Sequence, residues 1–211
     1  MRHNYFYLLA YALVVAALVG CKGHKSTSND VSEVEAPKQL TEAHYVRESG
    51  YDAEQAFIVI SKKECKLSVY APTAQGDTVL VAEFPACLSK NKGNKEGKGD
   101  MRTPESPAGK PFKITQIQDA SSWEHDFGDG RGKILAYGHW FLRLDTPGHS
   151  GIGIHGSTNN RESVPGRASE GCIRLLDEDI DSLKVKYAYV GMPVTIKGED
   201  EGPLPFELKA R

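Results

Sequence analysis

The chain has 211 residues, with 26 Lys and Arg against 28 Asp and Glu, so its formal net charge is −2. This balance lacks the basic excess that indicates nucleic-acid binding, and we expect no nucleic-acid partner. A hydrophobic fraction of 39% allows one folded domain with an attached tether.

The first 20 residues have the pattern of a signal peptide. A short polar start is followed by an uncharged run over 5–20, which is short for a membrane span of about 20 apolar residues. The run ends at Leu18-Val19-Gly20-Cys21, which resembles a bacterial lipoprotein signal. We therefore expect lipidation of Cys21 and a membrane-anchored lipoprotein of the cell envelope, facing the periplasm or the cell surface. An ordinary secretory signal or an uncleaved anchor is the alternative.

Residues 21–55 are predicted to form the lipidated N-terminus and a flexible tether. They are mostly polar and cannot bury enough apolar surface to fold alone, although a short helix is expected around 41–47. A folded domain is predicted over 56–197, and 198–211 form a C-terminal tail.

Short strands dominate the predicted domain. They are rich in β-branched and aromatic residues and are separated by turn residues. In the longest one, Tyr137, His139 and Phe141 would share one face. The expected strands are 57–61, 66–71, 79–86, 112–118, 134–144, 151–155 and 194–196.

One helix is clear after these strands. Asp177 suits an N-cap, and Ile180, Leu183 and Tyr187 follow helical spacing. Many short strands with one or two short helices predict a mainly-β sandwich or barrel.

Four cysteines raise the question of disulfide pairing. With Cys21 acylated and Cys172 reactive, Cys65 and Cys87 are left on neighbouring predicted strands. An exported chain can form disulfides, but sequence does not establish the geometry, so a disulfide and two buried free thiols are both open.

Ser169-Glu170-Gly171-Cys172-Ile173-Arg174-Leu175, preceded by Ile154-His155-Gly156, is the most informative stretch. A thiol becomes a nucleophile beside a base, and a histidine is the usual base. The backbone N–H groups of Gly171 and Cys172 can face one point, as in an oxyanion hole. The Gly156 carbonyl can orient the imidazole of His155. The pattern therefore predicts a cysteine acyltransferase.

This stretch resembles the catalytic signature of the YkuD-type L,D-transpeptidases, bacterial enzymes that crosslink peptidoglycan. The signature has histidine and a small residue, a loop, then Ser-X-Gly-Cys, an apolar residue and Arg or Asn. Glu170 departs from it, because many members carry a second histidine there. Further landmarks are 57–60, 67–70, 99–104 and 140–144.

The resemblance implies an L,D-transpeptidase fold and an enzyme of cell wall biogenesis that acts on peptidoglycan stem peptides. Cys172 would attack the third stem residue, release D-Ala and form a thioester, and another stem's amine would then complete a 3→3 crosslink. It also implies acylation of Cys172 by carbapenem-type β-lactams. Hydrolysis by water (L,D-carboxypeptidase), attachment of a protein to peptidoglycan, and a lipid-tethered wall-binding pseudoenzyme are the alternatives.

Further residues have less certain assignments. Arg174 is predicted to bind a substrate carboxylate, with an ion pair to Asp177 as the alternative. Ser169 and His139 are predicted to contact substrate, His139 from the cleft beside Tyr137, with an exposed or packing histidine as an equal alternative for His139. Glu170 is expected to be a loop residue. We expect no metal site, since the histidines lack zinc-site spacing. We also expect no cofactor and a monomer.

Overall fold

The computed structural model describes residues 44–45 and 49–210. Every described residue belongs to one compact unit. The predicted signal peptide, Cys21 and most of the predicted tether lie outside the described residues. Within the described part, no helix is both long and apolar enough to cross a membrane.

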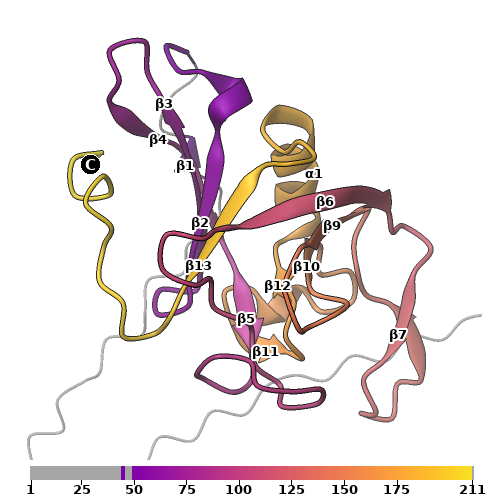
Figure 1. The fold of residues 1–211 in the computed structure, drawn as a ribbon. Coiled ribbons are helices and arrows are strands. Elements are labelled where there is room, and N and C mark those ends of the chain that lie inside the picture. The colour runs from indigo at the N-terminus through magenta and orange to yellow at the C-terminus, as the bar shows by residue number, and fades with distance from the viewer. Residues whose placement is uncertain (1–43, 46–48, 211) are drawn as a thin grey trace, which may run out of the picture. The chain divides into compact units, whose positions relative to one another are not determined.

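Eleven strands form one mixed sheet, which confirms the mainly-β prediction (Figure 1). Three neighbouring pairs in it are parallel, namely β2 with β13, β10 with β12, and β5 with β11. In order across the sheet, the strands are β1 (His44–Tyr45), β4 (Thr78–Pro85), β3 (Lys66–Pro72), β2 (Phe57–Ser61), β13 (Pro193–Lys197), β6 (Phe112–Asp119), β9 (Trp140–Leu144), β10 (Gly153–His155), β12 (Ile173–Arg174), β5 (Cys87–Ser89) and β11 (Gly166–Ser169).

The sheet curls back on itself. Only Ala86 separates β4 from β5, yet these strands lie near opposite ends of the sheet order. A single residue spans less than 4 Å, so the two ends of the sheet must approach each other. Apolar side chains of alternating positions, among them Ile58, Ile60, Leu67 and Val69, fill the enclosed core.

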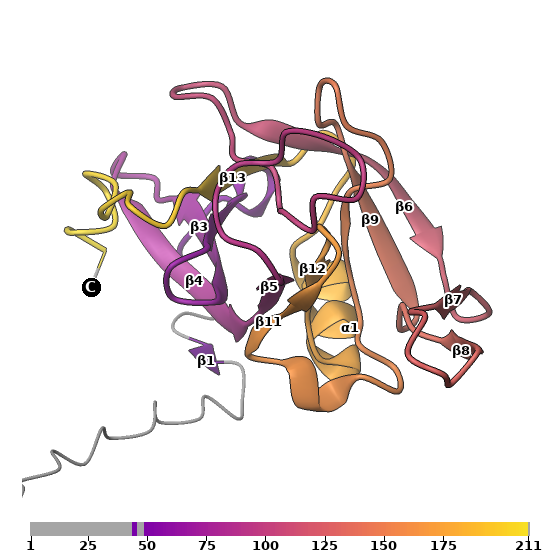
Figure 2. The same ribbon diagram turned by 90° about the horizontal axis from the view of Figure 1, so that it is seen from below.

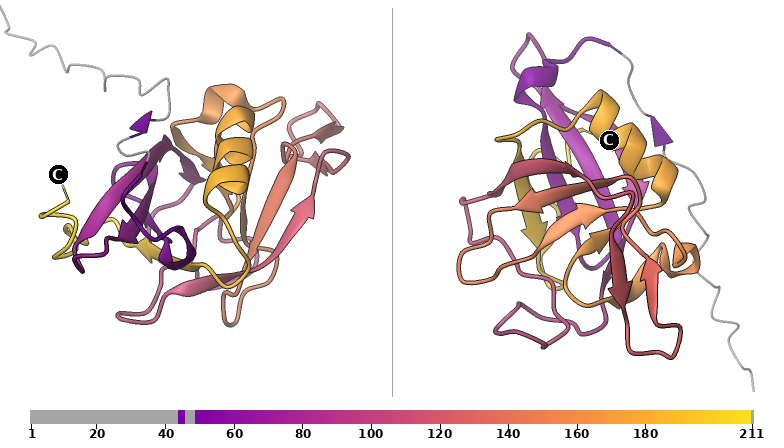
Figure 3. Two further views of the ribbon diagram at one scale, coloured as in Figure 1. Left: turned by 90° about the horizontal axis from the view of Figure 1, so that it is seen from above. Right: turned by 90° about the vertical axis from the view of Figure 1, so that its right-hand side faces the viewer.

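The predicted helix is α1 (Asp177–Lys186), which packs against β9 and β10 (Figure 3). Ile180 and Leu183 are fully buried on its inner face. Leu176 occupies the N-cap position, so Asp177 is the first helical residue rather than the cap. Its carboxylate instead accepts hydrogen bonds from the Ser157 N–H (2.7 Å) and the Thr158 hydroxyl (2.6 Å). Two 3-10 turns, η1 (Ala53–Gln55) and η2 (Arg161–Ser163), complete the helical content of the described residues.

Two predicted elements differ in the structure. The single strand over 134–144 is interrupted at Gly138, whose φ of 69° belongs to the left-handed region. The part before it is β8 (Lys133–Leu135), which pairs with β7 (Glu124–Asp126) in a hairpin beyond the ends of β6 and β9 (Figure 2). Of the expected helix over 41–47, only His44–Tyr45 is described, and it is a strand paired with β4.

The segment after β13 folds back on the domain. Phe206 packs edge-on against Phe57 and Tyr70, with ring centroids 5.3 and 5.2 Å away. Glu207 pairs with Lys197 at 2.6 Å, and both side chains are buried. Contacts of aromatic rings and a buried ion pair therefore hold most of the predicted tail.

The structure also decides between the two cysteine alternatives. Cys65 and Cys87 are free thiols, and Cys87 is fully buried. The Cys65 Sγ–H donates to the Lys62 carbonyl at 3.9 Å.

Candidate active site

A cavity of about 390 Å³ is lined by residues of β10 and β12 and of the segments that precede them, and both Cys172 and His155 line it. The two strands are parallel neighbours, with Ile154 opposite Ile173 and His155 opposite Arg174. This register brings together the two motifs that lie 17 residues apart in the sequence (172 − 155).

His155 is buried, with 3% of its surface exposed. Its Nδ1 lies 2.7 Å from the Gly156 carbonyl oxygen. Because a carbonyl can only accept, Nδ1 carries the proton and Nε2 is left as the basic nitrogen. The ring lies between Phe141, stacked at 5.6 Å, and Tyr137 at 4.8 Å.

The same surroundings keep His155 neutral. Burial, and then the positive charge of Arg174, lower the pKa of the imidazole to about 3. The imidazole is therefore an uncharged base over the physiological pH range.

Gly156 cannot be replaced by a larger residue without movement. A Cβ built there would overlap the Asp177 carboxylate and approach the Gly138 backbone within 2.7 Å. The close approach of Gly138 and Gly156 therefore requires that neither residue has a side chain.

A tight turn over residues 169–172, the candidate catalytic turn, presents Cys172. The Ser169 hydroxyl donates to the Cys172 carbonyl at 2.6 Å and accepts the Gly171 N–H at 3.3 Å. Gly171 has a φ of 142°, and a Cβ on it would lie 3.0 Å from the Arg102 carbonyl oxygen. Ser169 is buried and lines the cavity, but its hydroxyl is used within the turn. The Gly171 N–H was predicted to face the cavity; here it donates to Ser169.

The Cys172 thiol is protonated at rest. Burial raises its pKa, while the Gly153 N–H and the charges of Arg174 and Arg143 act in the opposite direction. Its Sγ–H donates to the Gly151 carbonyl at 3.3 Å. The cavity thus holds a neutral thiol and a neutral imidazole, and the nucleophile must be generated during attack.

Arg174 is a buried cation with 4% of its surface exposed. Its guanidinium lies 5.0 Å from the centre of the Phe127 ring, and its Nε is buried without a hydrogen-bond partner. Among the described residues it forms no ion pair, and Asp177, the alternative partner, is used elsewhere. The arrangement leaves Arg174 able to receive an anion in the cavity.

His139 lies outside the cavity, contrary to its predicted place in the cleft. Its side chain is 61% exposed and pairs with Asp181 of α1 at 2.8 Å. The turn at Gly138 ends the alternation that would have placed it beside Tyr137, which does line the cavity.

Sequence reasoning missed His125. This residue of β7 lines the cavity, and its Nε2 lies 3.2 Å from Glu170 Oε2. The Tyr137 hydroxyl lies 3.4 Å from its Nδ1. Glu170, expected to be a loop residue, thereby connects the catalytic turn with the β7–β8 hairpin. No local motif marks His125, since only the long-range fold brings it to Glu170.

Side chains of metal-binding type line the cavity, namely His125, His149, His155, Glu170 and Cys172, but they are not arranged to hold a metal ion. Over 49–210 no group of three or more His, Cys, Asp or Glu side chains has the geometry to hold a metal ion.

The family model of the YkuD L,D-transpeptidase catalytic domain matches residues 55–196. The chain belongs to this family. The match contains both strands of the cavity, the catalytic turn and the β7–β8 hairpin. A search of curated proteins found no match.

Solved structures with a similar fold include three bacterial proteins. Bd1075 of Bdellovibrio bacteriovorus is 23% identical, with a TM-score of 0.47 over 68% of this chain and 48% of that chain. An L,D-transpeptidase of Mycobacterium smegmatis is 18% identical, with a TM-score of 0.49 over 68% and 59%. The helical cell shape determining protein Pgp2 of Campylobacter jejuni is 18% identical, with a TM-score of 0.47 over 74% and 51%. The matched part therefore spans between about half and three fifths of these proteins.

Proposed function

We propose that this YkuD-family chain is an L,D-transpeptidase that forms 3→3 crosslinks between peptidoglycan stem peptides. The observation that carries the proposal is the convergence of Cys172 and an oriented, neutral His155 in one cavity, beside a buried Arg174 without an ion-pair partner. This set combines a nucleophile, a base and an anion site, which acyl transfer from a carboxylated peptide requires.

The proposed reaction begins with proton transfer. His155 Nε2 accepts the thiol proton as Cys172 Sγ attacks the carbonyl of the third stem residue. The Cys172 N–H, joined by the Gly171 N–H on release from its long bond to Ser169, stabilises the oxyanion. His155 then returns the proton to the departing amine of D-Ala, and a thioester is left on Cys172.

The second half of the reaction reverses these roles. The side-chain amine of another stem peptide attacks the thioester, and His155 accepts its proton. The new amide forms, the Cys172 sulfur leaves, and the proton returns to it. Arg174 holds a carboxylate of the donor while Cys172 attacks in the first half, since guanidinium groups pair with carboxylates in a forked geometry.

A product analysis tests this proposal. The full chain is incubated with purified tetrapeptide muropeptides, and the products are read by mass spectrometry. We expect free D-Ala and a 3→3 dimer, both absent with Cys172→Ala and both retained with the surface variant His139→Gln.

Other products would contradict the proposal in defined ways. Tripeptide without dimer would indicate an L,D-carboxypeptidase, and a muropeptide bound to a protein amine would indicate protein attachment. Unchanged substrate would favour a wall-binding pseudoenzyme.

We also propose that the chain acts in the cell envelope as a lipoprotein anchored through Cys21. Its support is the sequence pattern at 5–21 alone. A fatty-acid probe should label the wild type in cells and leave Cys21→Ser unlabelled, with the variant protein leaving the membrane fraction. An unlabelled wild type would contradict the anchor.

A further inference from the structure

Lys95 belongs to the long loop between β5 and β6, and it lines the cavity together with Cys172. Its Nζ lies 3.8 Å from the position that a Cβ on Gly171 would occupy, so the ammonium group is close to the catalytic turn. Only 8% of its side chain is exposed. A lysine placed so close to a nucleophile and so little exposed differs from an ordinary surface lysine.

Asp100 fixes the direction of Lys95. Its carboxylate accepts the Lys95 ammonium at 2.6 Å and the backbone N–H groups of Glu96, Gly97 and Arg102 at 2.7, 3.0 and 3.1 Å. Burial alone would raise the pKa of Asp100, but these hydrogen bonds lower it well below its usual range. The loop thus keeps a charged carboxylate that orients the ammonium and leaves two of its three donors for another partner.

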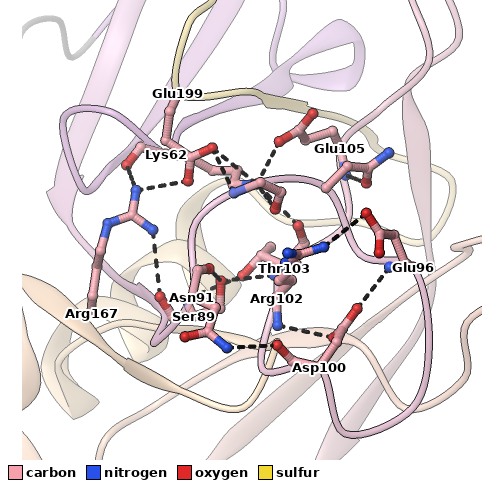
Figure 4. A network of polar contacts seen from close by, with 12 residues as sticks. Lys62, Ser89, Asn91, Glu96, Asp100, Arg102, Thr103, Glu105, Arg167 and Glu199 are labelled. Atoms are coloured by element: carbon pink, nitrogen blue, oxygen red, sulfur yellow. Dashed lines mark hydrogen bonds and ion pairs between the residues drawn. The ribbon is translucent and has the colours of Figure 1, made fainter.

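A buried lysine, Lys62, forms hydrogen bonds to the same loop on both sides of Lys95 (Figure 4). Lys62 is fully buried, and its Nζ donates to the Gly93 carbonyl at 2.7 Å and to the Thr103 carbonyl at 3.2 Å. Glu105 completes the contact at 2.6 Å. Because Lys62 holds the loop on either side of Lys95, the cation is positioned before any ligand arrives.

Lys95, Arg174 and the exposed Lys98 line the cavity, and the first two are held in position by their contacts. Arg174 lies against Phe127 of the β7–β8 hairpin, and Lys95 lies against Gly171 on the side of the loop. Glu170 is the one acidic residue among the described lining residues, and it pairs with His125. A cavity so arranged suits a donor with a carboxylate on each side of the reacting carbonyl.

Resting on the proposed function, we propose that Lys95 is a specificity-determining residue that binds the side-chain carboxylate of the third stem residue. This residue carries the carbonyl that Cys172 attacks, and it stays on the enzyme as the thioester. An ammonium held next to Gly171 suits the part of the donor that stays, whereas Arg174 takes the carboxylate of the departing D-Ala. The substrate class is a donor whose third residue has a free side-chain carboxylate, in preference to its carboxamide.

Binding without turnover tests this inference. Two stem tetrapeptides that differ only in that carboxylate or carboxamide are titrated by calorimetry into the full chain carrying Cys172→Ala. A hydrogen bond to a charged group predicts about tenfold tighter binding of the carboxylate. Adding Lys95→Gln should bring the two affinities together by weakening only the carboxylate peptide.

Lys92→Met is the matched control. Lys92 is an exposed cation of the same loop that lines a different cavity, so its loss changes the net charge equally and should keep the tenfold preference. Lys95→Arg retains the charge and should also keep the tenfold preference. If Lys95→Gln does not fold, Lys95→Arg still provides a folded variant at this position for the titration. A preference that persists in Lys95→Gln, or an equal loss for both peptides, would overturn the inference.

The readout separates the two proposals. The wild-type chain is assayed in parallel for D-Ala release and dimer formation. Discriminating binding without these products would overturn the proposed function, while products without discrimination would overturn the role of Lys95.

Discussion

Lys62 and Arg174 are both buried cations, and their surroundings differ completely. The chain itself neutralises Lys62, through Glu105 at 2.6 Å, Glu199 at 3.5 Å and two backbone carbonyls (Figure 4). Arg174 faces an aromatic ring and a cavity, and the described residues supply it with no carboxylate. Lys62 is a structural charge, and Arg174 is the charge that we propose binds a substrate carboxylate.

The difference shows how the fold divides stability from function. A buried charge without a partner is costly, so it persists where it serves a site. The Lys62 cluster is connected to that site through Arg167, whose guanidinium donates a hydrogen bond to the Lys62 backbone carbonyl at 2.6 Å. Arg167 belongs to β11, the strand that leads into the turn of Cys172.

The largest effect is expected from Lys62→Met. It leaves Glu105 without its cation, while Glu199 keeps its pair with Arg167 at 2.9 Å, and breaking a buried pair costs about 3 kcal/mol. Both carboxylates are partly exposed, which places the effect at the low end of such losses. Urea unfolding would measure it, with Lys63→Met as the control, since Lys63 is exposed. An unchanged unfolding free energy would mean that the cluster does not support the fold.

Arg174→Met should behave in the opposite way. Removing an uncompensated buried charge should leave the unfolding free energy unchanged or raise it. Affinity for the donor peptide should fall about tenfold, because one charged hydrogen bond is lost. Calorimetry on Cys172→Ala protein, with and without Arg174→Met, measures the affinity. Strong destabilisation with unchanged affinity would make Arg174 a structural cation like Lys62.

The neutral state of His155 predicts a pH dependence of stability. Its folded pKa of about 3 lies below the ordinary value of 6.5, so the unfolded chain binds more protons between these values. Stability from this group is fully present above pH 6.5 and is lost toward pH 3, by about 1.4 kcal/mol per pH unit. Unfolding free energies of wild type and His155→Gln, compared from pH 7 to 4, should converge as pH falls. Parallel curves would contradict a neutral buried imidazole.

The smallest effect is expected from His139→Ala. This histidine forms an exposed pair with Asp181, which raises the histidine pKa, and such pairs contribute at most about 1 kcal/mol. Thermal unfolding and D-Ala release should both stay close to wild type. A large loss of turnover would show that the cavity extends to the surface of α1.

Sequence patterns predicted the elements with strong local signals. The β-branched run 57–61 is β2 with the expected bounds, and the helical spacing of Ile180 and Leu183 identified α1. They missed β5, β11 and β12, which are two to four residues long and form through pairing with distant strands. Alternation also failed across Gly138, where a positive φ turns the chain and displaces His139.

The residues of the candidate site likewise fall into those that a local motif predicts and those that only the fold brings together. Cys172, His155 and the Gly156 carbonyl follow from a motif, because their relative placement depends on a short register between β10 and β12. His125 and Lys95 come from segments that only the curled sheet brings to the cavity. The use of the Gly171 N–H within the turn depends on a side-chain rotamer of Ser169, which no pattern encodes.

Acylation of the full chain by a carbapenem-type β-lactam tests the central claim most directly. Intact-mass analysis and peptide mapping should find one adduct per chain, on Cys172, with Cys65 and Cys87 unmodified. The rate should be nearly constant between pH 5 and 8, because His155 is neutral throughout this range and the resting thiol is protonated. An adduct on another residue, or one that persists in Cys172→Ala, would contradict the account.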